Sequence, residues 1–197
     1  MRVRVTEVLD YFQAPELVAW KLRVGTKEAG RISREAIKIG TAVDEHIKVS
    51  PNAVIATTSR NLETRNCIAA YHKWLNLYKP ESVAVGERFT VLNEYPCEIT
   101  GEPDLLIDGV LTDIKCSKRI SANYWLQVNV YAHFLGYKRV AILRLDKESA
   151  SYEYVVKDYD KSLVNVWLGL LRAYLYYKGV DSGGDELREV GSVKEVA

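Results

Sequence analysis

The feature that most constrains this chain is an Asp-Gly pair, Asp108-Gly109, between two apolar runs in the segment GEPDLLIDGVLTDIKCSK at 101–118. Asp-Gly is a strong signal for a two-residue β-hairpin loop, because both residues tolerate the positive φ angles that such a loop requires. The segment therefore predicts two antiparallel strands, 96–107 and 110–116. A two-residue loop also sets their register, since residues pair by counting outward from the loop.

Counting outward pairs Ile107 with Val110 and places Asp104 directly opposite Asp113. Two facing carboxylates repel each other and destabilise a hairpin. A divalent cation between them reverses the sign of that interaction, and hard cations such as Mg²⁺ and Mn²⁺ prefer oxygen ligands. The register therefore favours a metal site. The alternative is that both aspartates lie on a solvated surface.

A lysine belongs to the same face of the predicted hairpin. Because side chains alternate along a strand, Lys115 lies beside Asp113, and Glu102 faces Lys115 from the other strand. A lysine next to a metal site can orient an attacking water or stabilise charge on a phosphate. Its alternative role is an ion pair with Glu102, and the two roles can coexist.

Helical and strand patterns alternate along the rest of the chain. Apolar spacing and end signals predict helices over 7–12 with Thr6 as cap, 15–25, 33–49 starting at Ser33, 59–78 with Ser59 as cap, 121–136 and 160–178. The remaining extended segments are strands over 83–91, 138–146 and 151–157, with a turn at Asn93-Glu94. This order indicates an α/β fold, with a mixed central β-sheet flanked by helices.

The length fits one domain, which we expect to cover 1–180. Its first part, 1–80, is helical, and the core with the hairpin is 81–180. The charged, Gly-rich segment 181–197 predicts a mobile tail.

Composition limits the possible functions. Lys and Arg number 27 and Asp and Glu 26, so the formal net charge is +1. This balance argues against binding nucleic acid by bulk charge alone, but it permits a local basic patch. No stretch approaches the ~20 apolar residues that span a bilayer, and the N-terminus lacks the apolar run of a signal peptide. We therefore expect a cytoplasmic protein with no membrane partner. The single Met and two Gln are a hint of a thermophilic source.

The three cysteines, Cys67, Cys97 and Cys116, are scattered and form no C-x-x-C pair. Neither a disulfide framework nor a four-cysteine metal cluster is expected from them. They are predicted to be small buried or half-buried thiols.

Several motifs resemble those of one nuclease superfamily. Pro103-Asp104, followed after the hairpin by the sequence DIK at 113–115, is similar to the PD-(D/E)XK signature. The segment GTAVDEH at 40–46 resembles the helical G-x-x-x-H segment of the RecB-like branch, VGERF carries its extra acidic residue, and LQVNVY carries its Q-x-x-x-Y motif. The matches occur in the right order over roughly residues 36–145. The opening VTEVLDYF is similar to the start of phage and mitochondrial genome-maintenance exonucleases of this group.

The resemblance implies a restriction-endonuclease-like core with an N-terminal helical extension, and a bound Mg²⁺ or Mn²⁺. By the same resemblance, the metal ligands are His46, Glu87, Asp104, Asp113 and the backbone carbonyl of Ile114, and Lys115, Gln127 and Tyr131 complete the catalytic set. CRISPR-associated members of the branch hold an iron–sulfur cluster through cysteines near the C-terminus, which this chain lacks, so no such cluster is expected. No P-loop motif is present, so no bound nucleotide is expected.

The residues themselves leave other roles open. A lone helical histidine such as His46 is more often a surface or core residue than a ligand. Glu87 alternates with apolar residues on its strand face, which predicts a partly buried carboxylate whose partner is either a metal or an arginine. Gln127 and Tyr131 share a helix face, and their alternative role is packing against the sheet.

Basic and aromatic residues follow the hairpin. Lys118 and Arg119 are placed for phosphate contact, and Tyr124 for stacking on a base of a single strand. With the resemblance, they predict a metal-dependent deoxyribonuclease, an exonuclease on single-stranded DNA or DNA ends in repair, recombination or replication. The alternatives are a structure-specific endonuclease and a non-catalytic nucleic-acid-binding module on a nuclease fold. The oligomeric state stays open.

Overall fold

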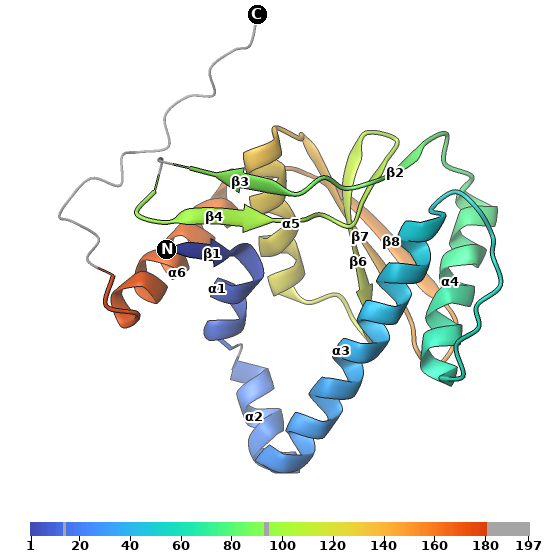
Figure 1. Cartoon of the computed structure of the whole chain (residues 1–197), viewed down its shortest axis with the longest axis horizontal. Helices are drawn as coiled ribbons and strands as arrows, with labels where there is room; N and C mark the ends of the chain where they lie inside the picture. The colour runs from blue at the N-terminus through green and yellow to red at the C-terminus, as the bar shows by residue number, and fades with distance from the viewer. Residues whose placement is uncertain (14, 93–94, 181–197) are drawn as a thin grey trace, which may run out of the picture.

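The computed structural model describes residues 1–13, 15–92 and 95–180, which form two mixed β-sheets with helices around them (Figure 1). The smaller sheet has the strand order β1 (Arg2–Arg4), β4 (Glu98–Gly101), β3 (Phe89–Val91). The larger has the order β2 (Val83–Val85), β5 (Leu105–Ile107), β6 (Val110–Cys116), β7 (Arg139–Leu145), β8 (Tyr152–Asp158). The pairs β1–β4 and β6–β7 are parallel, and the other pairs in these two sheets are antiparallel. The predicted fold class is confirmed.

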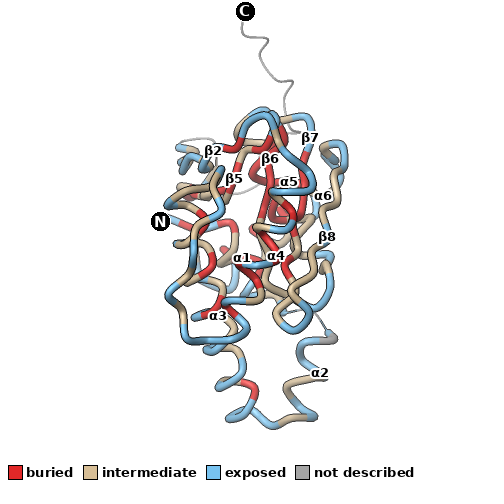
Figure 2. Tube along the Cα trace, turned by 90° about the vertical axis from the view of Figure 1, so that its right-hand side faces the viewer, coloured by how far each residue is buried: buried red, intermediate tan, exposed pale blue. Residues whose placement is uncertain are grey.

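Helices cover both faces of the larger sheet. One face is packed by α3 (Thr26–Val49) and α4 (Leu62–Tyr78), and the other by α5 (Ala122–Leu135), against which α1 (Val5–Tyr11) and α6 (Lys161–Tyr177) pack. The short helix α2 (Pro15–Val24) joins α1 to α3. The bend where α2 ends and α3 begins, called the elbow below, projects away from the sheets (Figure 1). The buried segments gather at the central strands and the helices next to them (Figure 2).

The β5–β6 hairpin forms as its Asp-Gly pair predicts. The two loop residues have φ angles of 48° and 74°, which are the positive values that a type I′ turn requires. The ladder runs from the Ile107–Val110 pair to the Leu105–Thr112 pair, which is the predicted register. The residues of β6 then alternate between the α5 side and the α3–α4 side of the sheet.

Two predicted strands are each divided where the two sheets part. The expected strand 83–91 is β2 and β3, which belong to different sheets, and 96–107 divides in the same way into β4 and β5. Pro103 has no N–H to donate to a ladder. Gly86 donates its N–H to Asp104 O at 3.0 Å, and a Cβ on this glycine would lie 2.3 Å from Pro103 O. The chain therefore passes from one sheet to the other at two adjacent places, both next to Asp104.

Helix α3 is longer than predicted. It begins after Gly25 rather than at Ser33. Its first turns lie on the elbow, where Ile32 is 38% exposed, whereas Ile39 and Ile47 further along are buried against the sheet. Apolar periodicity identifies only the part of a helix that packs on a core, so the exposed turns carried no such signal.

Two predicted helix caps are also wrong. The cap of α4 is Asn61 rather than Ser59, since the Asn61 side chain accepts a hydrogen bond from Thr64 N at 2.9 Å. Helix α1 follows strand β1 directly, so Arg4 is its N-cap residue and Thr6 lies inside the helix. Helices α2, α5 and α6 and strands β7 and β8 agree with their predicted ranges to within two residues.

Within the described ranges, no helix is both long enough and apolar enough to cross a membrane. The predicted turn at Asn93-Glu94 and the predicted tail at 181–197 lie outside the described residues.

The crossing at Gly86 generates a stability prediction. Gly86→Ala should lower the free energy of unfolding by about 2 kcal/mol, because the added Cβ must displace the backbone of Pro103. Gly169→Ala in α6 is the matched control. Nothing lies within 4 Å of its added Cβ, so the same change should raise stability by up to about 1 kcal/mol. Urea unfolding measures both values, and wild-type stability in G86A would show that the crossing is loosely packed.

Candidate active site

The hairpin brings two aspartates together beyond the last pair of its ladder. Asp113 lies on β6 and is 1% exposed, and Asp104 lies just before β5. The Asp104 side chain accepts a hydrogen bond from Ile114 N at 2.6 Å through Oδ2. The Asp104 and Asp113 carboxyl groups are close enough for each to affect the pKa of the other. Two carboxyl groups in contact can share a proton or a cation between them.

Lys115 pairs with the aspartate of its own strand. Its Nζ lies 2.7 Å from Asp113 Oδ2 and 5.2 Å from the centre of the Tyr124 ring. The alternative role considered for Lys115, an ion pair with Glu102, does not occur among the described residues. Glu102 instead contacts Arg88 at 2.7 Å and Lys48 at 3.4 Å, because the chain has left the ladder at this point.

Helix α5 holds the other oxygen of Asp113. Gln127 Nε2 donates to Asp113 Oδ1 at 3.1 Å and to Tyr131 OH at 3.0 Å. Both side chains are buried, with 8% and 3% of their surface exposed. Gln127 and Tyr131 therefore share the predicted helix face, and this face of α5 holds Asp113 through the hydrogen bond from Gln127.

A third carboxylate, which the sequence analysis did not single out, comes from α3. Asp44 is close enough to raise the pKa values of both Asp104 and Asp113 by its charge. Its Oδ2 lies 3.0 Å from Lys48 Nζ, while its Oδ1 is buried and has no hydrogen-bond partner among the described residues. A usable signal was present, because the spacing G-x-x-x-H counted from Gly40 ends on Asp44 rather than on His46.

The predicted ligand His46 points elsewhere on α3. Its ring centre lies 5.9 Å from that of His72 on α4, and its buried Nε2 has no hydrogen-bond partner in the part of the chain that the structure describes. Residues two apart on a helix do not face the same way, so Asp44 and His46 project in different directions. The structure thus brings Asp44 rather than His46 beside the aspartate pair. A metal-binding role for His46 stays a prediction.

The other two predicted metal ligands differ in placement. Ile114 is at the site, since its N–H is bonded to Asp104. Glu87 lies in the crossing between β2 and β3, and it is exposed, so the expected partial burial on a strand face is wrong. The metal-binding roles of Glu87 and of the Ile114 carbonyl stay predictions.

The residues predicted to contact nucleic acid lie around the end of β6. Lys118 and Arg119 are exposed, and Lys118 Nζ lies 2.6 Å from Glu148 Oε1. Tyr124 is half-buried beside Lys115. On the next position of α5, the Trp125 ring lies 4.2 Å from Lys157 Nζ.

Burial and mutual repulsion govern protonation at the site. Burial, followed by the charge of Asp113, raises the pKa of Asp104 to about 8. Burial also raises the pKa of Asp113, against the opposing effect of Lys115. Burial of Lys115 would lower its pKa, but the Asp113 and Asp104 carboxylates outweigh that effect and raise it. At neutral pH the aspartate pair therefore holds a proton, while Lys115 is charged.

An aspartate on α1 also acts on this lysine. Burial raises the pKa of Asp10, and the charges of Arg4 and Lys115 oppose the shift. Asp10 is therefore within electrostatic reach of Lys115 and adds another acidic group to the surroundings of the site.

The donor set of the site fits a hard divalent cation. Within the described ranges, no group of three or more His, Cys, Asp and Glu side chains is already arranged around a metal position. However, Asp44 Oδ1 is a buried oxygen that accepts no hydrogen bond from the described residues, which is costly. Asp113 Oδ2 is buried against the Lys115 ammonium, and Asp104 is close enough to both aspartates to feel their charge. Carboxylate oxygens are the donors that Mg²⁺ and Mn²⁺ prefer. A cation here would replace Lys115 as the partner of Asp113 Oδ2.

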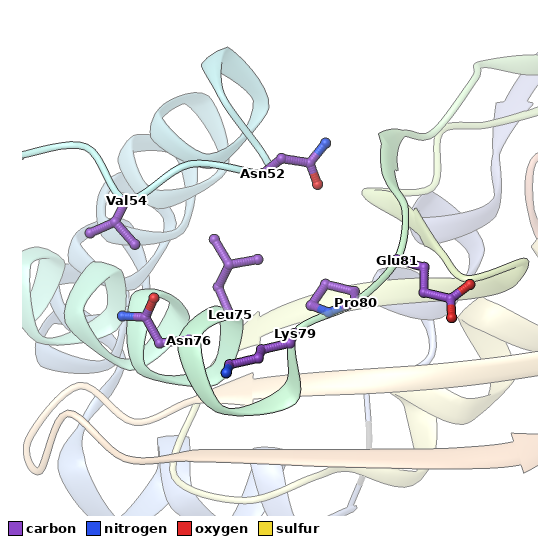
Figure 3. Close-up of a pocket in the computed structure, with 7 residues that line it drawn as sticks. All are labelled: Asn52, Val54, Leu75, Asn76, Lys79, Pro80 and Glu81. Carbon is purple, nitrogen blue, oxygen red and sulfur yellow. The ribbon is translucent and has the colours of Figure 1, made fainter.

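The hollow drawn in Figure 3 is separate from these carboxylates. It has a volume of about 370 Å³ and lies between the end of α4, the segment before β2 and the turn after α3. Its lining residues are Asn52, Val54, Leu75, Asn76, Lys79, Pro80 and Glu81. None of them is a predicted site residue.

Comparison with known proteins supports the fold. No protein-family model and no curated protein sequence matches this chain. The structure is similar to that of an exonuclease candidate from Eubacterium rectale, with a TM-score of 0.52 and 19% identity over 77% of this chain and 69% of the other. Weaker similarity extends to the alkaline exonuclease LHK-Exo from Laribacter hongkongensis, with a TM-score of 0.49 and 13% identity over 89% of this chain and 87% of the other. At such identities the first similarity shows a shared α/β fold.

The raised pKa of Asp104 predicts a pH-dependent response to cations. An unfolded Asp titrates near pH 4, whereas Asp104 in the folded chain has a pKa of about 8. The protonated Asp104 therefore contributes stability that is complete below about pH 4 and is lost as the pH rises towards 8. With chelator, the melting temperature should therefore fall over that range. Mg²⁺ or Mn²⁺ should restore it, and should do so more at about pH 8 than at pH 5, because protons compete with the cation.

Asp104→Asn tests this assignment by thermal unfolding at several pH values. The variant should show a flatter pH profile in chelator and lose a cation-induced shift of at least about 3 °C. Glu148→Gln, which changes an exposed carboxylate outside the site, should behave as wild type. An unchanged cation response in D104N would contradict a cation site at Asp104.

Proposed function

We propose that this chain is a metal-dependent nuclease that hydrolyses phosphodiester bonds in DNA, acting as an exonuclease on single strands or ends. One observation carries the proposal. Asp104, Asp113 and Lys115 meet where the β5–β6 hairpin ends, and the unpartnered carboxylate oxygen of Asp44 lies close enough to act on both aspartates. Buried acidic groups gathered around one lysine are unfavourable for stability alone, so their placement points to chemistry.

The proposed ligands are Asp104 and Asp113 with Asp44, and the resemblance adds His46, Glu87 and the Ile114 carbonyl. When bound, a divalent cation supplies a water of lowered pKa and neutralises charge on the phosphate. Gln127 keeps Asp113 Oδ1 occupied, so Oδ2, which pairs with Lys115 at 2.7 Å, is the oxygen that would turn to a cation. Tyr131, through its hydrogen bond to Gln127, maintains that orientation.

Lys115 acts as a positive charge rather than as a base. The two aspartates raise its pKa, so its ammonium remains protonated at neutral pH and cannot accept a proton. A charged ammonium next to the proposed cation is suited to stabilising the negative charge that develops on the phosphate. The same charge could also orient the attacking water.

The surroundings of the site support a nucleic-acid substrate. Lys118 and Arg119 are exposed at the end of β6, and the ion pair of Lys118 with Glu148 is exposed, so exchanging it for a phosphate contact costs little. Tyr124 and Trp125 offer aromatic rings close to Lys115 and Lys157. Aromatic rings mixed with cations suit single strands, whose bases stack on them. The exonuclease description of the Eubacterium rectale protein agrees with this proposal.

The principal test replaces the proposed catalytic side chains one at a time and leaves the other charged residues unchanged. Asp113→Asn and Lys115→Met should each reduce cleavage of end-labelled single-stranded DNA by at least about 100-fold, because each removes charge stabilisation at the reacting phosphate. Lys138→Met, on an exposed lysine before β7, is the control and should keep full activity. The assay compares Mg²⁺, Mn²⁺ and chelator. Wild-type rates in D113N or K115M would refute the mechanism.

The same assay separates the alternatives. Cleavage of circular single-stranded DNA, flaps or junctions in preference to linear ends would indicate an endonuclease. Tight DNA binding by wild-type protein without cleavage in any divalent cation would indicate a binding module.

The position of Asp44 generates a further prediction. Asp44→Asn should raise the Mg²⁺ concentration needed for half-maximal cleavage by about 10-fold or more, because the site loses a charged oxygen donor. Its exposed neighbour offers a matched control, since Glu45→Gln removes the same charge one position away. His46→Gln in the same titration tests the histidine independently. An unchanged Mg²⁺ requirement in D44N, with a raised one in H46Q, would transfer the ligand role to His46.

A further inference from the structure

Two of the three cysteines meet in the core between the larger sheet and α3–α4. Cys67 lies on α4 and is fully buried, and Cys116 is the last residue of β6 and is half-buried. Each thiol is close enough to shift the pKa of the other. Cys67 Sγ also lies 3.8 Å from Leu145 O, and Leu145 is the residue of β7 paired with Cys116. The two thiols therefore face each other across the α4–sheet contact.

This pair is distinct from the candidate active site, although it adjoins it in sequence. Cys116 follows Lys115 directly, but alternation along β6 puts the thiol on the α4 side of the sheet and the lysine on the α5 side. Cys97 belongs to the other core, with α1 and α5, so it is not a competitor for either partner. Lys147, which follows β7, acts on both thiols through its charge.

We infer that Cys67 and Cys116 form an oxidisable dithiol, which closes to an intrachain disulfide between α4 and β6 on exposure to a peroxide. Cys116, the partly exposed thiol, reacts first. Its sulfur attacks the O–O bond, becomes a sulfenic acid and releases one water from hydrogen peroxide. The Cys67 sulfur then attacks that sulfur, forming the S–S bond and releasing a second water. Overall, two thiols are oxidised to one disulfide while one hydrogen peroxide is reduced to two waters.

The location of the cross-link determines its effect. The closed loop would run from the middle of α4 through β2, β3, β4 and β5 to the end of β6, so it contains Asp104 and Asp113. A loop of this length restricts the unfolded chain strongly and should therefore stabilise the fold. The disulfide would tie α4 to the strand that carries Asp113 and Lys115, without touching either side chain.

The test treats the full chain with one equivalent of hydrogen peroxide, alkylates the remaining thiols and maps the peptides by mass spectrometry. The expected result is a monomer that has lost two hydrogen atoms, carries one alkyl group on Cys97 and yields a linked peptide pair containing Cys67 and Cys116. Thermal unfolding of the same sample should show a melting temperature raised by about 5 °C or more, reversed by dithiothreitol.

Variants distinguish a specific dithiol from general oxidation. Cys116→Ser should abolish both the cross-link and the rise in melting temperature, and Cys97→Ser, the matched control in the other core, should retain both. Because Cys67 is fully buried and its replacement can impair folding, the wild-type peptide map serves as the readout for that position. Three alkylated thiols after treatment, a link through Cys97, or a sulfinic acid on Cys116 without a link would overturn the inference. None of these readouts depends on nuclease activity.

Discussion

The hydrogen bond from Ile114 N to Asp104 is the interaction on which the arrangement of the site depends. The last residue of β5 in the β5–β6 ladder is Leu105, so Asp104 lies just outside the ladder. At Pro103, next to Asp104, the chain belongs to neither sheet. At 2.6 Å, this bond keeps the Asp104 side chain against β6 after the ladder has ended. It thereby holds one carboxylate against the other, which Coulomb repulsion would otherwise drive apart. Burial and, second to it, the charge of the neighbouring Asp113 raise the pKa of Asp104, although the hydrogen bond from Ile114 opposes that shift.

Local signals predicted the parts of the site that lie within one element or one hairpin. The Asp-Gly loop determines the register that brings Asp104 near Asp113, and the four-residue spacing of Gln127 and Tyr131 puts both on one face of α5. The division of strands 83–91 and 96–107 was not predicted, because the place where two sheets separate depends on tertiary packing at Gly86 and Pro103. Asp44 was missed for a related reason. Its role arises from the way α3 packs across β6, and the neighbouring histidine offered a more familiar ligand.

Acidic and basic side chains are paired with each other around the candidate active site. Asp44, Glu102 and Asp113 form ion pairs of 2.7–3.4 Å with Lys48, Arg88 and Lys115. Two of these pairs, Lys48 with Glu102 and Arg88 with Glu102, form between segments that are distant in sequence, so they join α3 to the two crossings between the sheets. A net charge of +1 is therefore compatible with a site that contains opposite charges at high density.

The two carboxylates belong to different parts of the fold, as a consequence of the double crossing between the sheets. Asp113 is in the middle of a central strand, paired on one side with β7 and held from α5. Asp104 is attached to the segment that continues into the three-stranded sheet, and Gly86 of the neighbouring crossing is bonded to its carbonyl. Asp104 is thus held from two directions, at its carbonyl by the crossing segment and at its side chain by Ile114 of β6. The position proposed for the cation therefore lies at the junction of the two sheets.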